Sequence, residues 1–149
     1  MTVVEAGDQF SQTRIYFKFN DGGEHFPEAP NSSTDWDLSF RFAWIEINGG
    51  ISGPAEMELL YLDFEDYGDL LSAPSGDYLT DTTESLAFDA GQGWYHYVQG
   101  TEDWEINDRN YVVRAGDGRF YKLKIDNFLD EQGRPGLLKF RWAEIASPR

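Results

Sequence analysis

Two histidines and one internal methionine are the residues of this chain best suited to hold the iron of a cofactor. Imidazole nitrogen is the commonest axial ligand of haem iron, and thioether sulfur is also used. His96 stands among Trp94, Tyr95 and Tyr97, and flat aromatic side chains suit the face of a porphyrin. The alternative is a histidine that simply packs in a half-buried aromatic surface. The sequence leaves both interpretations open.

Met57 is the second candidate ligand, and packing in the hydrophobic core is its alternative. His25 lies in a loop with several Pro and Gly residues, where plain exposure to solvent is the alternative. The methionine and the two histidines are far apart in the sequence, so any shared site depends on the fold.

Carboxylates offer two further kinds of chemistry. Asp35 and Asp37 flank Trp36 and point the same way on a strand, an arrangement that glycoside hydrolysis can use. The clusters at 63–66 and 102–105 could hold calcium through oxygen ligands, although neither matches an EF-hand loop. A solvated surface is the alternative in all three cases.

Several functional classes are disfavoured by what the chain lacks. No GxSxG, HExxH, P-loop or GxGxxG pattern occurs, which favours a binding protein over an enzyme. The chain has no cysteine, so disulfides, zinc–thiolate sites and iron–sulfur clusters are excluded. The formal net charge of -15 opposes binding to nucleic acid or to anionic membranes. No apolar run approaches transmembrane length.

The elements that must position these residues are predicted to be strands. A chain of 149 residues with 16% aromatic side chains predicts one ordered, aromatic-rich domain over 1–149. Residues 1–10 are expected as a lead-in that need not be ordered. Strands are predicted at 12–19, 35–44, 93–98 and 104–106, and one or two helical turns at 64–71. The stretch 56–64 fits both a buried strand and a short helix, and the strand is favoured. The fold class is therefore all-β, with antiparallel sheets and at most one short helix.

The stretch 111–144 is the clearest pattern, a three-strand meander. Its first turn, 115–118, is expected to supply two glycines at positive φ. In the middle strand Tyr121, Leu123 and Ile125 share one face, and alternation puts basic residues on the other. That basic face is either a solvated surface or an anion site for carboxylates or propionates; its members are Lys122, Lys124, Lys139 and Arg141.

The strand 35–44 is predicted to lie in the middle of the core. Five large apolar residues alternate along it and would share one face: Trp36, Leu38, Phe40, Phe42 and Trp44. Fully burying one such side chain contributes on the order of 2 kcal/mol.

Several of these segments together resemble the HmuY-like family of bacterial haem-binding, haemophore-type envelope proteins. The segments are Tyr16 to Phe19 with the Asp21-Gly22-Gly23 turn, Thr34 to Arg41, Asn48-Gly49-Gly50, Gly93-Trp94-Tyr95, the stretch from Tyr111 to Asp126, and Lys139 to Trp142. The resemblance covers most of the chain.

The resemblance implies an all-β fold and an exported or cell-surface bacterial protein, whose leader is not in this chain, that captures haem. It also implies axial ligation by His or Met from the middle of the chain. The position that matches the family's histidine is Gln99, and His96 lies three residues earlier, on the opposite face of the strand. The segment 73–91, which matches the source of the other ligand, has neither His nor Met.

The first hypothesis is thus a non-enzymatic protein that captures haem or a related planar ligand. Its cofactor ligands would be His96 and Met57, and an outer-membrane receptor would be its partner. The alternative is a cofactor-free structural or protein-interaction β domain of the bacterial cell envelope. A third hypothesis is a carbohydrate-active enzyme that uses Asp35 and Asp37.

Overall fold

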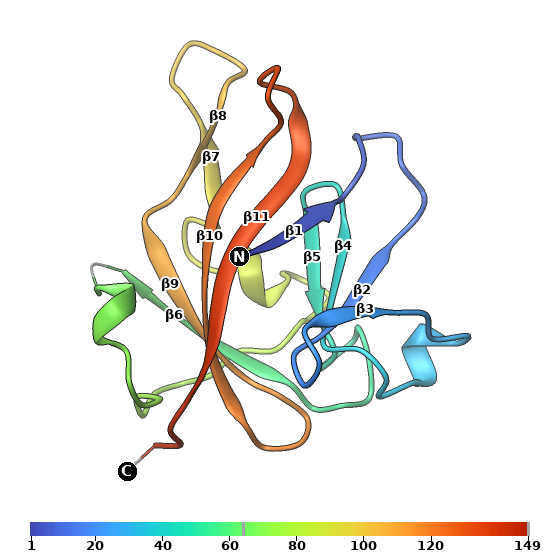
Figure 1. Cartoon of the computed structure of the whole chain (residues 1–149), viewed down its shortest axis with the longest axis vertical. Coiled ribbons are helices and arrows are strands. Elements are labelled where there is room, and N and C mark those ends of the chain that lie inside the picture. Colours follow the sequence, from blue (N-terminus) through green and yellow to red (C-terminus); the bar gives the residue numbers. More distant parts are fainter. Residues whose placement is uncertain (64, 149) are drawn as a thin grey trace.

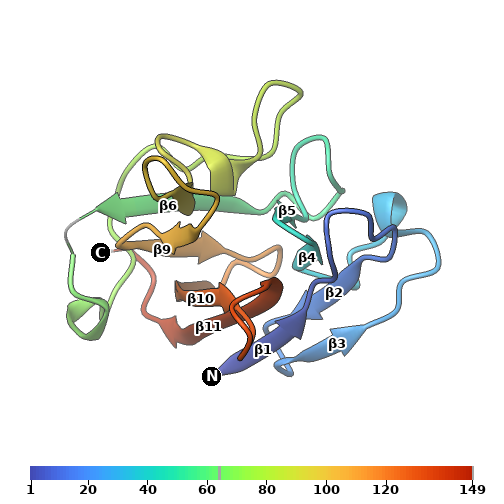
Figure 2. The same ribbon diagram turned by 90° about the horizontal axis from the view of Figure 1, so that it is seen from above.

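Two antiparallel sheets and a projecting hairpin form the computed structural model, which describes residues 1–63 and 65–148. The first sheet has five strands, in the order β1 (Thr2–Glu5), β11 (Pro135–Ile145), β10 (Phe120–Leu129), β9 (Arg109–Arg114) and β6 (Glu58–Asp63). The second has four, in the order β3 (Gly23–His25), β2 (Ile15–Lys18), β4 (Leu38–Arg41) and β5 (Trp44–Ile47). The hairpin consists of β7 (Tyr95–Tyr97) and β8 (Trp104–Ile106). Figures 1 and 2 show the two sheets side by side.

The helical content of the described residues is three 3₁₀ helices of three residues each: η1 (Pro30–Ser32), η2 (Tyr67–Asp69) and η3 (Ala87–Asp89). The predicted all-β class is therefore confirmed. Within residues 1–63 and 65–148, no helix has the length and apolar character needed to cross a membrane.

Aromatic side chains join the two sheets into one core. Phe19 stacks on Tyr121 with ring centroids 4.4 Å apart, and Phe40 stacks on Phe140 at 5.7 Å. Trp142 adds an edge contact to Phe19 at 5.3 Å. Each such pair adds about 0.5–1.5 kcal/mol beyond the burial of area, so these contacts hold β2 and β4 against β10 and β11.

The predicted meander is confirmed as β9, β10 and β11, paired antiparallel. The first turn differs in one respect from the prediction, because only Gly118 takes a positive φ, of 86°. Gly116 is needed for space instead, since a Cβ there would lie 2.8 Å from the carbonyl oxygen of Ala55.

The predicted strand over 35–44 is wrong in its second half. The chain turns back after Arg41, and the pair Arg41–Trp44 closes a two-residue hairpin between β4 and β5. Phe42 sits in this turn at a φ of 51°, an uncommon value for a bulky residue. Trp44 is 43% exposed, and the Arg41 guanidinium lies 4.5 Å from its ring centroid. Trp36, Leu38 and Phe40 are buried as predicted.

Several other predicted segments changed in extent, and the strands expected at 12–19 and 93–98 are shorter, as β2 and β7. The strand expected at 56–64 forms as β6, and its last residue, Phe64, lies outside the described residues. The helical turns expected at 64–71 are reduced to η2, which Asp66 caps by accepting a hydrogen bond from the Gly68 amide. Residues 1–10, expected as a lead-in, contain β1, which pairs with β11.

Candidate ligand-binding site

The β7–β8 and β10–β11 hairpins project at the same end of the molecule (top of Figure 1). An open cleft lies between these hairpins and the segment that follows β1. Its walls are the β7–β8 hairpin, the end of the β10–β11 hairpin and the segment that follows β1. The cleft has a volume of about 1380 Å³, above the range of roughly 300–1,000 Å³ typical of small-ligand pockets. It can therefore admit a large ligand.

The β10–β11 hairpin reaches the cleft because β10 is irregular near its end. The pairing register shifts at Asn127, whose side-chain oxygen accepts hydrogen bonds from the amides of Phe128 and Leu129. Beyond it, Asp130 accepts bonds from the amides of Gln132 and Arg134, which fixes the turn. A bulge of this kind bends a strand and increases its twist. The Phe128 ring, which follows it, contacts Trp104 of β8.

The β7–β8 hairpin is fastened at its base by Asn107. The Asn107 amide donates to the Trp94 carbonyl at 2.9 Å, and its side-chain nitrogen donates to the Gly93 carbonyl at 2.8 Å. The hairpin register places Tyr97 directly across from Trp104. These bonds set the hairpin's direction, so the two aromatic residues are held as a pair.

Trp104 is the centre of an aromatic wall on this side of the cleft. Its ring lies 5.1 Å from Tyr97, 5.6 Å from Phe42 and 5.0 Å from Phe128, measured between centroids. Phe128 is fully buried, whereas Tyr97 is 54% exposed. Three of these rings line the cleft, namely Phe42, Tyr97 and Trp104. A half-exposed tyrosine that packs edge-on against Trp104, above the buried Phe128, offers aromatic surface against which a flat ligand can pack.

A close backbone contact forms part of the cleft's opposite side. The Ala6 amide donates to the Gly136 carbonyl at 2.8 Å, and the Phe42 amide donates to the Ala6 carbonyl at 2.6 Å. Gly136 has a φ of 127°, and a Cβ there would overlap the carbonyl oxygen of Gly7. Glycine at this position therefore lets β1 approach β11 and connects the two walls.

Negative charge dominates the lining. Among the described residues that line it, Arg134 is the one basic residue, and the acidic ones are Glu5, Asp8, Glu102, Asp103 and Asp130. Arg134 is already paired, because its Nε lies 3.1 Å from a carboxylate oxygen of Asp130. Hydrogen bonds from the backbone amide of Arg134 hold the pKa of Asp130 below its ordinary value. The cleft thus presents an aromatic wall within a ring of carboxylates.

The two predicted cofactor ligands do not line this cleft. His96 lies on the exposed face of β7, where its Nδ1 is 2.6 Å from the Asn107 side-chain oxygen. Met57 is fully buried in the hydrophobic core, just before β6. His25 lies on β3, in the second sheet, between the carboxylates of Asp21 and Asp35 at 2.7 and 2.9 Å. The structure does not bring these three side chains together in the cleft.

The cleft suits the flat shape of haem, but its residues do not suit the iron and the carboxylates of haem. The aromatic wall suits a flat ring. Within residues 1–63 and 65–148, however, no histidine, methionine or cysteine lines the cleft, and Tyr97 is the one lining side chain of a type that ligates haem iron. Haem also carries two carboxylates, which would meet five others. The residues of the cleft therefore do not fit haem as an iron-ligated, anionic cargo.

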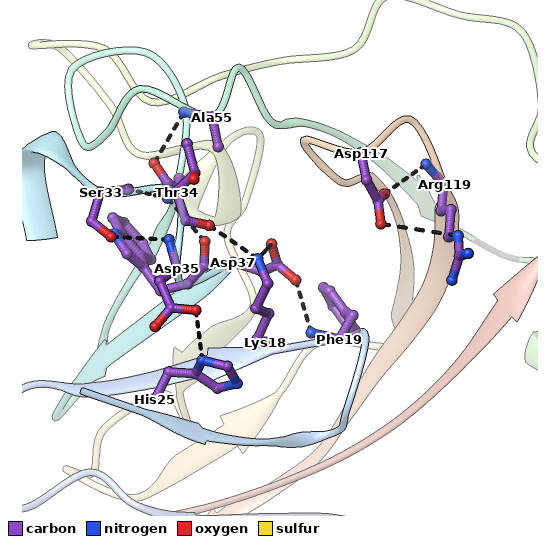
Figure 3. Close-up of polar contacts among 12 residues, drawn as sticks. Lys18, Phe19, His25, Ser33, Thr34, Asp35, Asp37, Ala55, Asp117 and Arg119 are labelled. Atoms are coloured by element: carbon purple, nitrogen blue, oxygen red, sulfur yellow. Dashed lines mark hydrogen bonds and ion pairs between the residues drawn. The ribbon is translucent and has the colours of Figure 1, made fainter. Parts of the chain in front are cut away.

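The acid pair Asp35 and Asp37 does not form a shared catalytic site. Figure 3 shows Asp35 directed toward His25 and Asp37 directed toward the Phe19 amide. Asp37 is buried and accepts a hydrogen bond from the Phe19 amide at 2.8 Å, and burial raises its pKa. Asp35 is exposed and bonded to His25. A smaller cavity of about 400 Å³ includes Asp37 but not Asp35.

The basic face of the meander is largely occupied. Lys122 is buried and donates to the Tyr67 carbonyl at 2.7 Å, with its ammonium 4.2 Å from the Tyr67 ring centroid. Lys124 pairs with Asp108 at 2.7 Å. Arg141 makes two hydrogen bonds to Asp126, at 2.9 and 3.0 Å. Because these basic side chains already have partners within the chain, the basic face is better explained as a solvated, internally paired surface than as an anion site.

The acidic clusters at 63–66 and 102–105 are also accounted for. Asp63 pairs with the buried Arg109 at 3.0 Å, and Glu102 and Asp103 belong to the cleft. Among the described residues, no group of three or more acidic or histidine side chains has a geometry that could hold a metal ion.

The aromatic wall is the part of the site that sequence reasoning missed. The signal was present, because strands at 93–98 and 104–106 joined by a short turn form a hairpin, and a hairpin pairs Tyr97 with Trp104. Phe42 could not be found in this way, since it was expected inside a strand.

Fold and cleft together define an all-β protein with a ligand-sized opening between hairpins, and solved structures show the same arrangement of strands. An HmuY analog from Tannerella forsythia, solved in its apo form, matches with a TM-score of 0.70 over 97% of this chain and 94% of its own, at 15% identity. A protein from Bacteroides vulgatus described as HmuY-like and heme-binding gives 0.67 over 94% and 88%, at 15% identity. A protein from Bacteroides fragilis described as a lipoprotein gives 0.64 over 94% and 85%, at 17% identity.

The particular fold is therefore HmuY-like, which confirms the resemblance found in the sequence. At these identities the likeness shows the fold alone. No protein-family model matches the sequence, and no curated protein matches it.

Proposed function

We propose that this chain is a non-enzymatic binding protein that holds a flat aromatic ligand in the cleft between the β7–β8 and β10–β11 hairpins. The observation that carries the proposal is the half-exposed Tyr97 ring standing on Trp104 inside an opening of about 1380 Å³. Packing against an aromatic wall stabilises the binding of any planar ring. Because the base of the hairpin is already fixed, binding costs less conformational entropy. A structural neighbour described as heme-binding supports a flat macrocycle as the ligand class. Haem belongs to this class, but its iron and its two carboxylates fit the residues of the cleft poorly.

Exported or cell-surface location in a bacterium is part of the same proposal. A neighbour described as a lipoprotein supports it. An outer-membrane receptor that collects the ligand is the partner that this location suggests.

Titration with flat macrocycles of different charge, with ferric and ferrous haem among them, tests the proposal. We expect saturable quenching of tryptophan fluorescence at micromolar ligand, reduced in Tyr97→Ala and unchanged in Phe26→Ala, a control whose ring is 79% exposed outside the cleft. The Soret band of the bound haem assigns the iron ligands. A shift lost in His96→Ala would identify His96 as a ligand and would place the iron at the exposed face of β7, outside the cleft. The absence of both quenching and spectral change would remove haem as the ligand.

A cofactor-free interaction domain of the cell envelope is the second candidate. The placement of His96 on the outer face of β7 and of Met57 in the core favours it, because neither faces the cleft. Under this alternative the cleft would bind no planar compound, so a null titration with several flat macrocycles of different charge would support it.

A further inference from the structure

The charges around the aromatic wall affect which flat ligand the cleft can bind. Carboxylates approach it from each of its walls: Glu102 and Asp103 from the β7–β8 turn, Asp130 from the β10–β11 hairpin, and Glu5 and Asp8 from the segment around the end of β1. Arg134, the one basic residue of the lining, is engaged with Asp130. No other ion pair among the described residues involves these five acids. The field in the cleft is therefore negative.

A negative field and an aromatic surface favour the same kind of ligand. The faces of Tyr97 and Trp104 carry the negative side of the ring quadrupole, which attracts a cation placed over them. The surrounding carboxylates attract that cation by ordinary Coulomb interaction, and the walls of a cleft concentrate the field. An anion of the same shape meets repulsion from both sources.

We propose that the cleft selects flat aromatic ligands that carry positive charge, such as cationic macrocycles or quaternary heteroaromatic rings, over anionic ligands of the same shape. This inference rests on the proposed function for the binding of a flat ligand, and it adds the sign of the ligand's charge. It also accounts for the poor chemical fit of haem, whose two carboxylates would face the carboxylates of the cleft.

Two metal-free porphyrins with the same ring and opposite charge provide the test. One carries four N-methylpyridinium groups and the other four phenylsulfonate groups, so iron ligation plays no part. Calorimetric titration at low salt is expected to show the cationic porphyrin binding at least about tenfold more tightly. The difference should shrink as ionic strength rises, because salt screens exposed charges.

Removing the negative charges of the β7–β8 turn tests whether the selectivity comes from the cleft or from the net charge of the whole chain. The double variant Glu102→Gln/Asp103→Asn is expected to weaken the cationic porphyrin by about threefold to tenfold and to strengthen the anionic one. Among the described residues, neither the Glu102 nor the Asp103 side chain makes a hydrogen bond, so the two substitutions break none. The matched control, Asp77→Asn/Glu84→Gln, removes the same charge from two exposed acids outside the cleft and is expected to leave both affinities unchanged.

The outcomes distinguish this inference from the function on which it rests. Equal affinity for the two porphyrins, or an equal loss in the control double variant, would overturn the charge selectivity while leaving flat-ligand binding in place. No binding of either porphyrin beyond that of Tyr97→Ala, with folding verified by near-ultraviolet circular dichroism, would overturn the proposed function as well.

Discussion

Gly136 sits where β1 comes closest to β11, and replacing it by alanine tests that contact. Its φ of 127° lies in the region that side chains rarely adopt, and a Cβ would overlap the Gly7 carbonyl oxygen. We expect Gly136→Ala to lower the free energy of unfolding in urea by about 2–4 kcal/mol, from backbone strain plus the displaced strand.

Gly118→Ala is the matched control for this prediction. Gly118 also has a positive φ, of 86°, but a Cβ there meets nothing within 4 Å. We expect Gly118→Ala to lower the free energy of unfolding only by the backbone strain, about 1–2 kcal/mol. Equal losses in the two variants would show that the close approach of Gly7 has no energetic importance.

His25 gives stability a pH dependence of known sign. Its hydrogen bond to Asp21 and, to a smaller extent, that to Asp35 raise the pKa of the imidazole above 6.5. A raised folded-state pKa stabilises the folded chain fully below the unfolded value and loses that contribution as pH rises through the folded value. The difference in unfolding free energy between the parent chain and His25→Gln should therefore be largest near pH 6 and decline at alkaline pH.

Asp21→Asn provides the check on that assignment, because it removes the first of the two carboxylate partners while keeping the histidine. The pH dependence above pH 6 should be weaker in this variant. If the slope is unchanged, the pH dependence comes from another group.

At the scale of the elements, Lys122 is one of several residues that hold segment 65–78 against the five-stranded sheet. The buried ammonium donates to the Tyr67 carbonyl at 2.7 Å and lies over the Tyr67 ring. Lys122→Met keeps the aliphatic stem and removes the charged donor. We expect a loss of about 1.5–3 kcal/mol, since hydrogen bonds to charged groups are worth that much. Faster hydrogen exchange should be confined to the amides of 65–73.

Lys124→Met is the comparison at the neighbouring position. Its partner Asp108 is almost fully exposed, so the pair should contribute at most about 1 kcal/mol. A larger loss in Lys124→Met than in Lys122→Met would contradict the view that burial makes the difference.

How far the sequence predicts these elements depends on how local their signals are. The meander of β9, β10 and β11 was predictable because its side chains alternate and its turns contain glycine. The β4–β5 hairpin was not, since apolar alternation runs unbroken through the turn and Phe42 takes a positive φ without being glycine or asparagine. Packing of that ring on Trp104 and Phe128 stabilises a conformation that local preference disfavours.

The cleft could not be predicted because it belongs to the whole molecule. Its lining comes from segments near residues 5–9, 97–104 and 129–137, which only the folded sheets bring together. Candidate ligands chosen by residue type, His96 and Met57, lie outside it. The acidic residues of the lining were visible in the sequence, but their grouping around Tyr97 and Trp104 required the three-dimensional arrangement.

At the scale of the whole molecule, stability and binding are expected to reside in different places. The rings of Phe19 and Tyr121 stack between the two sheets, and Phe19 is 2% exposed. Phe19→Ala should therefore lower the free energy of unfolding by about 3–5 kcal/mol. Tyr97 is half-exposed at the rim of the cleft, so Tyr97→Ala should cost no more than about 1 kcal/mol while weakening the binding of a flat ligand.

Equilibrium unfolding of both variants, together with calorimetric titration of the cationic porphyrin, measures this separation. Phe19→Ala should retain the affinity of the parent chain under conditions where it is still folded, because the stacked pair does not line the cleft. A large loss of stability in Tyr97→Ala, or a loss of affinity in folded Phe19→Ala, would mean that the hairpin and the sheet core form one cooperative unit. The aromatic wall would then be part of the core rather than a surface kept open for a ligand.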